Sequence, residues 1–169
     1  MPPHAIQIAD QQTALPIDRQ ALKNLVLTVL AGERCRAAKI SVAIVDDAAI
    51  QALNLRYLNH DYPTDVLTFP LENGARGLEA EIVISSETAL RQAEEFGTSA
   101  QHELRLYVIH GLLHLFDYDD HDPGFAAAMR AREEHYLRLI EGTGGGQRAG
   151  GAGQKRPQAG KSPSARRKR

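Results

Sequence analysis

The segment Leu104-Arg-Leu-Tyr-Val-Ile-His-Gly-Leu-Leu-His-Leu-Phe116 is apolar at nearly every position. A helix that is apolar on all sides lies inside a domain, so the other elements of this chain must pack around it. His110 and His114 stand four residues apart, which places their imidazoles one turn apart on one helix face. A third histidine, His121, follows after an Asp-rich turn.

These histidines predict a metal site. Neutral imidazoles one turn apart can bind one zinc ion at ~2.0–2.1 Å each, and His121 can close the site from the loop. Three protein ligands leave a fourth position for water, as in catalytic zinc sites. Gly111 stands where the zinc-protease pattern H-E-x-x-H carries its general base. Because glycine inside a helix costs ~1 kcal/mol relative to alanine, we expect a backbone or a substrate to approach closely there.

Three motifs carry a resemblance to a known family. His110-Gly-Leu-Leu-His-Leu-Phe-Asp-Tyr-Asp-Asp-His121 resembles the H-G-x-L-H-L-x-G-Y-D-H signature of the YbeY endoribonucleases, which are ribosomal RNA maturation factors. Upstream, Leu53-Asn54 and Asp61-Tyr-Pro-Thr-Asp-Val-Leu-Thr-Phe-Pro70 resemble that family's L-N and D-x-P-T-D-V-L-S-F-P. Glu81-Ile-Val-Ile-Ser85 resembles its G-D-I-V-I-S strand. The likeness covers about residues 40–140, in the family's order.

Helices mixed with strands around one buried helix predict an α+β fold with a small sheet. The resemblance implies a mixed, about four-stranded sheet packed by helices, similar to zinc metalloproteases, with one Zn²⁺ held by His110, His114 and His121. It further implies a single-strand-specific endoribonuclease whose partners are precursor rRNA and the small ribosomal subunit. The implied roles are late 3′-end maturation of the small-subunit rRNA and ribosome quality control, in the cytoplasm.

The chain departs from the family pattern at three places. The family arginine that follows the aromatic residue of L-N-x-x-Y-R falls on Leu58, and Arg56 is a weak candidate to replace it. The family glycine after the second histidine is Asp117, and the third histidine arrives one residue late. Asp120 therefore competes for the third ligand position, because zinc also accepts carboxylate oxygen at ~2.0–2.2 Å. We expect His121 to be the ligand, since a loop absorbs one inserted residue more easily than a helix rotates.

The predicted chemistry is metal-assisted hydrolysis of an RNA phosphodiester. Zinc lowers the pKa of its water to ~7 and can polarise a phosphoryl oxygen. No general base is identifiable from the sequence, so the zinc-bound water is the one catalytic feature predicted.

Two alternative functions remain. A zinc peptidase would need the glutamate that Gly111 replaces, and a non-catalytic ribosome-assembly factor would need a fourth protein ligand, such as Asp119 or Asp120.

Charge divides the chain into a domain, residues 1–141, and a tail, residues 142–169. The tail carries eight Lys and Arg residues between Arg148 and Arg169 and no acid, which leaves 12 basic and 21 acidic residues in the domain. Its Gly-rich composition predicts a disordered basic arm that contacts RNA phosphates, against the alternative of a solvated tail.

A single cysteine, Cys35, fits a reducing cytosol, and no signal peptide or membrane span is expected.

Apolar periodicity and capping residues predict the order of elements. The expected strands are Ala5–Ile8, Ile40–Val45, Val66–Phe69 and Glu81–Ser85, with a turn at Gly74–Gly77 before the last of them. The expected helices start at Asp18, at Asp46 or Asp47, at Ser86, at Thr98 or Ser99, and at Asp122-Pro123. The second helix is expected to face inward with Ile50, Leu53 and Tyr57. Asp65 is expected to hydrogen-bond its own turn.

Overall fold

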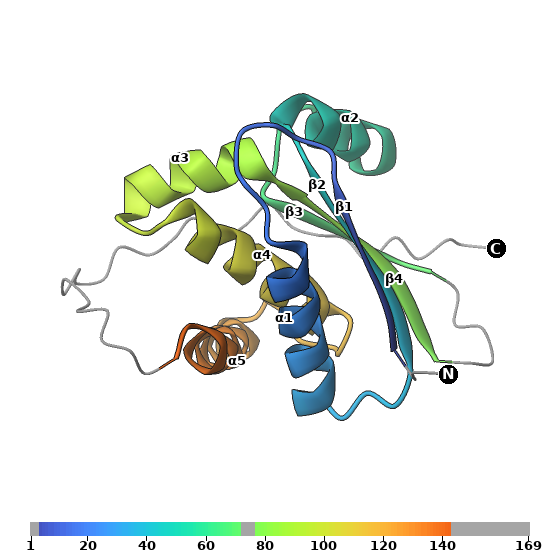
Figure 1. The fold of residues 1–169 in the computed structure, drawn as a ribbon. Helices are drawn as coiled ribbons and strands as arrows, with labels where there is room; N and C mark the ends of the chain where they lie inside the picture. The colour runs from blue at the N-terminus through green and yellow to red at the C-terminus, as the bar shows by residue number, and fades with distance from the viewer. Residues whose placement is uncertain (1–3, 72–76, 143–169) are drawn as a thin grey trace.

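The structure, a computed structural model, describes residues 4–71 and 77–142 (Figure 1). Most of the expected turn at residues 74–77, and the basic tail after Gly142, lie outside the described residues. None of the described helices is long and apolar enough to cross a bilayer. The elements in chain order are β1 (His4–Asp10), α1 (Arg19–Gly32), β2 (Ala38–Val45), α2 (Asp47–Leu58), β3 (Val66–Pro70), β4 (Leu78–Ser85), α3 (Ser86–Phe96), α4 (Ala100–His114) and α5 (Pro123–Glu141).

The four strands form one mixed sheet in the order β1-β2-β4-β3. β1, β2 and β4 run parallel, with Ile6 opposite Ile40 and Val42 opposite Ile82. β3 is an edge strand antiparallel to β4, and its Thr68 is also opposite Ile82. The predicted α+β fold with a four-stranded mixed sheet is confirmed.

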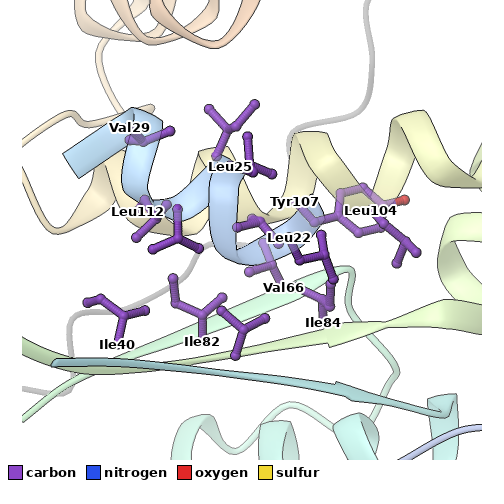
Figure 2. Close-up of a cluster of buried hydrophobic side chains, with 14 of the residues drawn as sticks. Leu22, Leu25, Val29, Ile40, Val66, Ile82, Ile84, Leu104, Tyr107 and Leu112 are labelled. Carbon is purple, nitrogen blue, oxygen red and sulfur yellow. The ribbon is translucent and has the colours of Figure 1, made fainter. Parts of the chain in front are cut away.

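Side chains alternate across the sheet and divide the core in two. One face of β2, β3 and β4 packs against α1 and α4, where Ile40, Val66, Ile82 and Ile84 meet Leu25 and Leu112 among others (Figure 2). The opposite face, with Ala43, Val45, Leu67 and Val83, packs against Ile50 of α2. The larger of these two clusters surrounds α4, as its sequence predicts.

Capping residues set the helix ends that the sequence predicts. Asp18, Asp46, Ser85, Ser99 and Asp122 each accept a hydrogen bond from a backbone N–H in the first turn of α1 to α5, respectively. Such N-caps satisfy donors that have no partner within the helix.

Gly111 lies where α4 packs closely against the sheet. A Cβ atom built there would lie 3.0 Å from Thr68 Oγ1, 3.1 Å from Ile82 Cγ2 and 3.2 Å from Val66 Cγ2. The group that approaches Gly111 is therefore a set of side chains from β3 and β4, where we expected a backbone or a substrate. The glycine serves the packing of α4 against the sheet.

The prediction that Tyr57 faces inward is wrong. Its side chain is 51% exposed, and its ring packs edge to face with Phe69, at 5.2 Å between centroids. Ile50 and Leu53 face inward as predicted: Ile50 and Asn54 are buried, and the half-buried Leu53 and Leu58 pack against the same apolar cluster. The buried Asn54 donates its Nδ2–H to the carbonyl oxygen of Tyr62 at 2.9 Å, which holds the returning loop against α2.

Candidate metal centre

His110 and His114 lie together on the last two turns of α4. Their Nε2 atoms are 3.0 Å apart, and the two rings meet edge to face at 4.6 Å between centroids. The four-residue spacing brings the rings to one side of the helix, and the apolar core around α4 fixes that side. The predicted pairing of the two imidazoles is therefore present in the structure.

Glu133 holds the far side of the His110 ring. Its Oε1 lies 2.6 Å from His110 Nδ1, and only 15% of the His110 side chain and 13% of the Glu133 side chain are exposed. A proton on Nδ1 donates to this carboxylate and leaves the Nε2 lone pair free for a metal ion. Sequence reasoning missed Glu133, because it lies on α5, 23 residues away from His110 and outside the histidine motif.

The loop between α4 and α5 is held at several points. Asp117 takes a left-handed conformation with a φ of 66°, which turns the chain out of the helix. Tyr118 then donates its hydroxyl hydrogen to Glu33 Oε2 at 3.2 Å, and Asp119 Oδ1 accepts the backbone N–H of His121 at 2.9 Å. Asp122 ends the loop as the N-cap of α5.

This loop places Asp120 beside the two histidines. One ligand atom from each of His110, His114 and Asp120 lies within 4.8 Å of the other two, so these three residues could hold one metal ion. His121 belongs to a second group, with Asp119 and Asp120, which shares Asp120 with the first but contains neither His110 nor His114. Its side chain is 52% exposed, and its Nε2 lies 3.7 Å from Asp119 Oδ1. That His121 supplies the third ligand stays a prediction.

The surroundings of the two imidazoles shift their pKa values in opposite directions. Burial alone would lower the pKa of His110, but the hydrogen bond and charge of Glu133, with the charges of Asp65 and Asp120, raise it above its ordinary value. Burial and the neighbouring charge of His110 lower the pKa of His114. Without a metal, His110 therefore holds a proton more readily than His114 does.

Asp65 combines its expected role with a second one. Its Oδ1 accepts the backbone N–H of Val66 at 2.8 Å and the hydroxyl of Thr64 at 3.2 Å, which is the predicted hydrogen bonding within its own turn. Burial raises the pKa of the Asp65 carboxyl, and the positive charge on His110 opposes that rise. Asp65 thus lies close enough to His110 to act on it, although its sequence position alone favoured the turn.

Leu58 and Arg56 occupy different environments near the end of α2. Leu58 is half-buried and packs on the apolar cluster of Ala43 and Leu67, so this position serves the core. Arg56 is exposed, and its guanidinium carbon lies 5.3 Å above the Tyr57 ring. A catalytic role for Arg56 stays a prediction.

The donor set fits a divalent first-row metal. Imidazole nitrogen and carboxylate oxygen are both accepted by zinc and by its neighbours in the series. The half-buried ligand atoms and the carboxylate behind His110 match the outer contacts that orient metal-bound histidines. Gly111 brings no side chain to the centre, so the general base of a zinc protease is absent from this position.

Comparison with known families identifies one match. The family model described as endoribonuclease YbeY matches residues 7–141. An endoribonuclease YbeY of Salinibacter ruber is 34% identical over 146 residues, with 82% of this chain and 93% of that protein covered. The Moorella thermoacetica endoribonuclease YbeY is 41% identical over 145 residues, covering 77% of this chain and 93% of that protein.

A solved structure also resembles this fold. The solution structure of TM1509 from Thermotoga maritima superposes with a TM-score of 0.57 at 27% sequence identity. The alignment covers 85% of this chain and 99% of that one.

Proposed function

Because the chain belongs to the endoribonuclease YbeY family, we propose that it is a metal-dependent, single-strand-specific endoribonuclease that acts in ribosomal RNA processing. The observation that carries the metal-dependent part is the pair of Nε2 atoms 3.0 Å apart, with His110 held from behind by Glu133. Imidazoles arranged in this way can bind a metal ion together, and a ligand from the 117–121 loop completes the set.

The proposed cofactor is one Zn²⁺ ion held by His110, His114 and one loop residue. His121 is the candidate that the sequence favours, and Asp120 is the one that the structure groups with the histidines. Bound there, a zinc ion would act as a Lewis acid on a phosphoryl oxygen and lower the pKa of a coordinated water. Glu133 keeps the His110 ring oriented, and Asp65 adds negative charge beside it.

The proposed substrate is the precursor of the small-subunit rRNA, cut late at its 3′ end, with ribosome quality control as an associated role in the cytoplasm. Family membership supports RNA as the substrate. The basic tail, residues 142–169, is proposed as an additional RNA-binding segment. Deletion of the tail is expected to flatten the salt dependence of RNA binding. The slope of log binding constant against log salt concentration should become less negative by about 0.7 for each phosphate of the single strand that the tail neutralises. An unchanged slope would exclude this role of the tail.

The central test is cleavage of a single-stranded RNA oligonucleotide by the full-length protein, with and without a chelator. We expect chelation and His114→Ala each to abolish cleavage. His102→Ala is the matched control, because His102 lies on the same helix but bonds to Glu141 through its Nδ1, at 2.8 Å. Cleavage that persists in the chelator, or in the His114→Ala variant, contradicts the proposal.

The same assay separates the rival functions. A peptidase of this fold would degrade casein, but a glutamate at position 111 would collide with Thr68, Ile82 and Val66. A non-catalytic assembly factor would bind metal and cleave neither RNA nor casein. Mapping of small-subunit rRNA 3′ ends, after incubation of precursor particles with the protein, then tests the proposed substrate.

A further inference from the structure

We propose that Asp120, and not His121, is the third protein ligand, so that the site is built from two histidines and one aspartate. This inference rests on the proposed metal-dependent function and departs from the three-histidine set that the family resemblance implies. It follows from the placement of the loop between α4 and α5 relative to the two imidazoles.

The first step is the spacing of the donor atoms. Ligand atoms at ~2.0–2.2 Å from a tetrahedral ion lie about 3.3 Å apart. The Nε2 atoms of His110 and His114 are already 3.0 Å apart, and Asp120 brings a carboxylate oxygen within 4.8 Å of ligand atoms on both rings. The three donor atoms are therefore already gathered around one point, and Asp120 has to move less than His121 to coordinate an ion there.

The second step is the position of His121. The backbone N–H of His121 donates to Asp119 Oδ1 at 2.9 Å, and the ring turns to the same carboxylate, with 3.7 Å between Nε2 and Oδ1. Its side chain is 52% exposed. To reach the two rings, His121 would have to break this turn and displace Asp120, which already occupies the place beside them.

The third step is that the loop is anchored on both sides of Asp120. Tyr118 donates to Glu33 at 3.2 Å upstream, and Asp122 accepts the backbone N–H of Gly124 at 2.8 Å downstream, as the cap of α5. A shift by one residue would move one of these anchors. The loop has one residue more than the family pattern before its third histidine. With both anchors in place, that additional residue leaves Asp120 beside the rings and His121 turned toward solvent.

A carboxylate ligand changes which metals the site accepts. Replacing a neutral imidazole by an aspartate removes one positive charge from the metal complex and adds a harder oxygen donor. Two histidines and one carboxylate with open positions suit Fe²⁺, and carboxylate oxygen suits Mn²⁺. We therefore expect Mn²⁺ to compete with Zn²⁺ more effectively here than in a variant with a third imidazole.

The test compares Co²⁺ affinity, followed by its visible absorption, among variants of the full-length protein. Asp120→Asn and Asp119→Asn each remove one negative charge, and only the first removes a proposed ligand. Removal of an outer-sphere partner already costs about 10–100-fold in affinity, so we expect about 100-fold or more for Asp120→Asn. Asp119→Asn and His121→Ala are expected to stay within about threefold of the parent protein. Asp120→His should restore binding, with an altered cobalt spectrum and weaker competition by Mn²⁺.

The opposite pattern, in which His121→Ala loses Co²⁺ and Asp120→Asn retains it, overturns the proposal. Equal affinity in both variants also overturns it, because the loop then supplies no ligand. Circular dichroism of each variant shows that a loss of binding is not a loss of fold. RNA cleavage is measured in parallel. If RNA cleavage is sensitive to the chelator but the cobalt pattern is the opposite one, only the assignment of Asp120 as the ligand is rejected. If the cobalt pattern is the expected one but RNA is not cleaved, only the proposed nuclease function is rejected.

Discussion

Glu133 contacts His110 from a helix that the histidine motif does not include. Its carboxylate, 2.6 Å from Nδ1, fixes both the orientation and the tautomer of a ring that is proposed to bind metal. We expect Glu133→Ala to weaken Zn²⁺ binding by about 10–100-fold, and Glu133→Gln by less, because the amide oxygen still accepts the hydrogen bond. Isothermal titration with Zn²⁺ measures both.

Glu134→Gln is the control for this substitution, because Glu134 is the next residue on α5 and is exposed. Equal affinities for the Glu133→Ala and Glu134→Gln variants would show that Glu133 does not support the site.

Glu33 predicts a pH dependence of stability. Burial alone would raise the pKa of this carboxyl, but hydrogen bonds from Tyr136 at 2.7 Å and Arg132 at 2.8 Å outweigh it and lower the pKa below 4.5. A lowered pKa in the folded state stabilises the fold above pH 4.5, and this stabilisation is lost as the pH falls through the folded-state value. We expect Glu33→Gln to cost about 1–3 kcal/mol at pH 7 and progressively less below about pH 4.5.

Urea denaturation of both proteins at several pH values measures this difference. Glu94→Gln, on the exposed face of α3, serves as the control and is expected to change stability by less than about 0.5 kcal/mol. A Glu33→Gln deficit that is the same at pH 3 and pH 7 would falsify the account.

At the scale of the element, the packing of α4 on the sheet depends on Gly111. Alanine is a better helix former by about 1 kcal/mol, but its methyl group would lie 3.0–3.2 Å from three side chains of β3 and β4. Overpacking of this kind costs about 1–3 kcal/mol. We therefore expect Gly111→Ala to lower the free energy of unfolding by about 1 kcal/mol, measured by urea denaturation. A stabilised variant would mean that α4 can move away from the sheet.

The elements could largely be predicted from the sequence, because their signals are local. Alternating apolar residues, Asp and Ser caps, and Pro123 at the start of α5 each act within a few residues. The exposed position of Tyr57 could not be predicted, since it depends on how α2 lies relative to the sheet. The strand order could not be predicted from the sequence either, because strand pairing depends on contacts distant in sequence; the family resemblance implied only a mixed, about four-stranded sheet.

The candidate site also combines features that local sequence signals predict with features that depend on distant contacts. The four-residue spacing of His110 and His114 is a local signal, and the structure brings the two rings together. Glu133 and Asp65 could not be recognised, because only the packing of α5 and the start of β3 brings them to His110. The choice between Asp120 and His121 depends on a loop conformation that the Glu33–Tyr118 hydrogen bond helps to set, and the sequence spacing does not contain that contact.

At the scale of the whole molecule, a metal ion bound as proposed would join α4 to the following loop. Because the ion binds the folded state, it stabilises that state by mass action. Removing metal that was present at about 100 times its Kd should lower the free energy of unfolding by about 2.7 kcal/mol. We expect saturating Zn²⁺ to raise the Tm of the metal-free protein by roughly 6–12 °C. Differential scanning calorimetry measures the shift, with His114→Ala as the control that should show none. Coincident melting of the metal-free and metal-loaded proteins would mean that no tight site exists.

The loop after α4 also carries Asp117, Asp119, Asp120 and Asp122, four carboxylates within six residues. RNA is a polyanion, so these carboxylates would repel a strand that binds at the proposed site, most strongly at low ionic strength. Charge of one sign around a site changes association rates by factors of about 10–1,000, here against the proposed substrate. A divalent cation bound between the loop and the histidines would remove part of that kinetic barrier. On the proposed function, metal loading would therefore govern how often RNA reaches the site, in addition to the chemistry that follows.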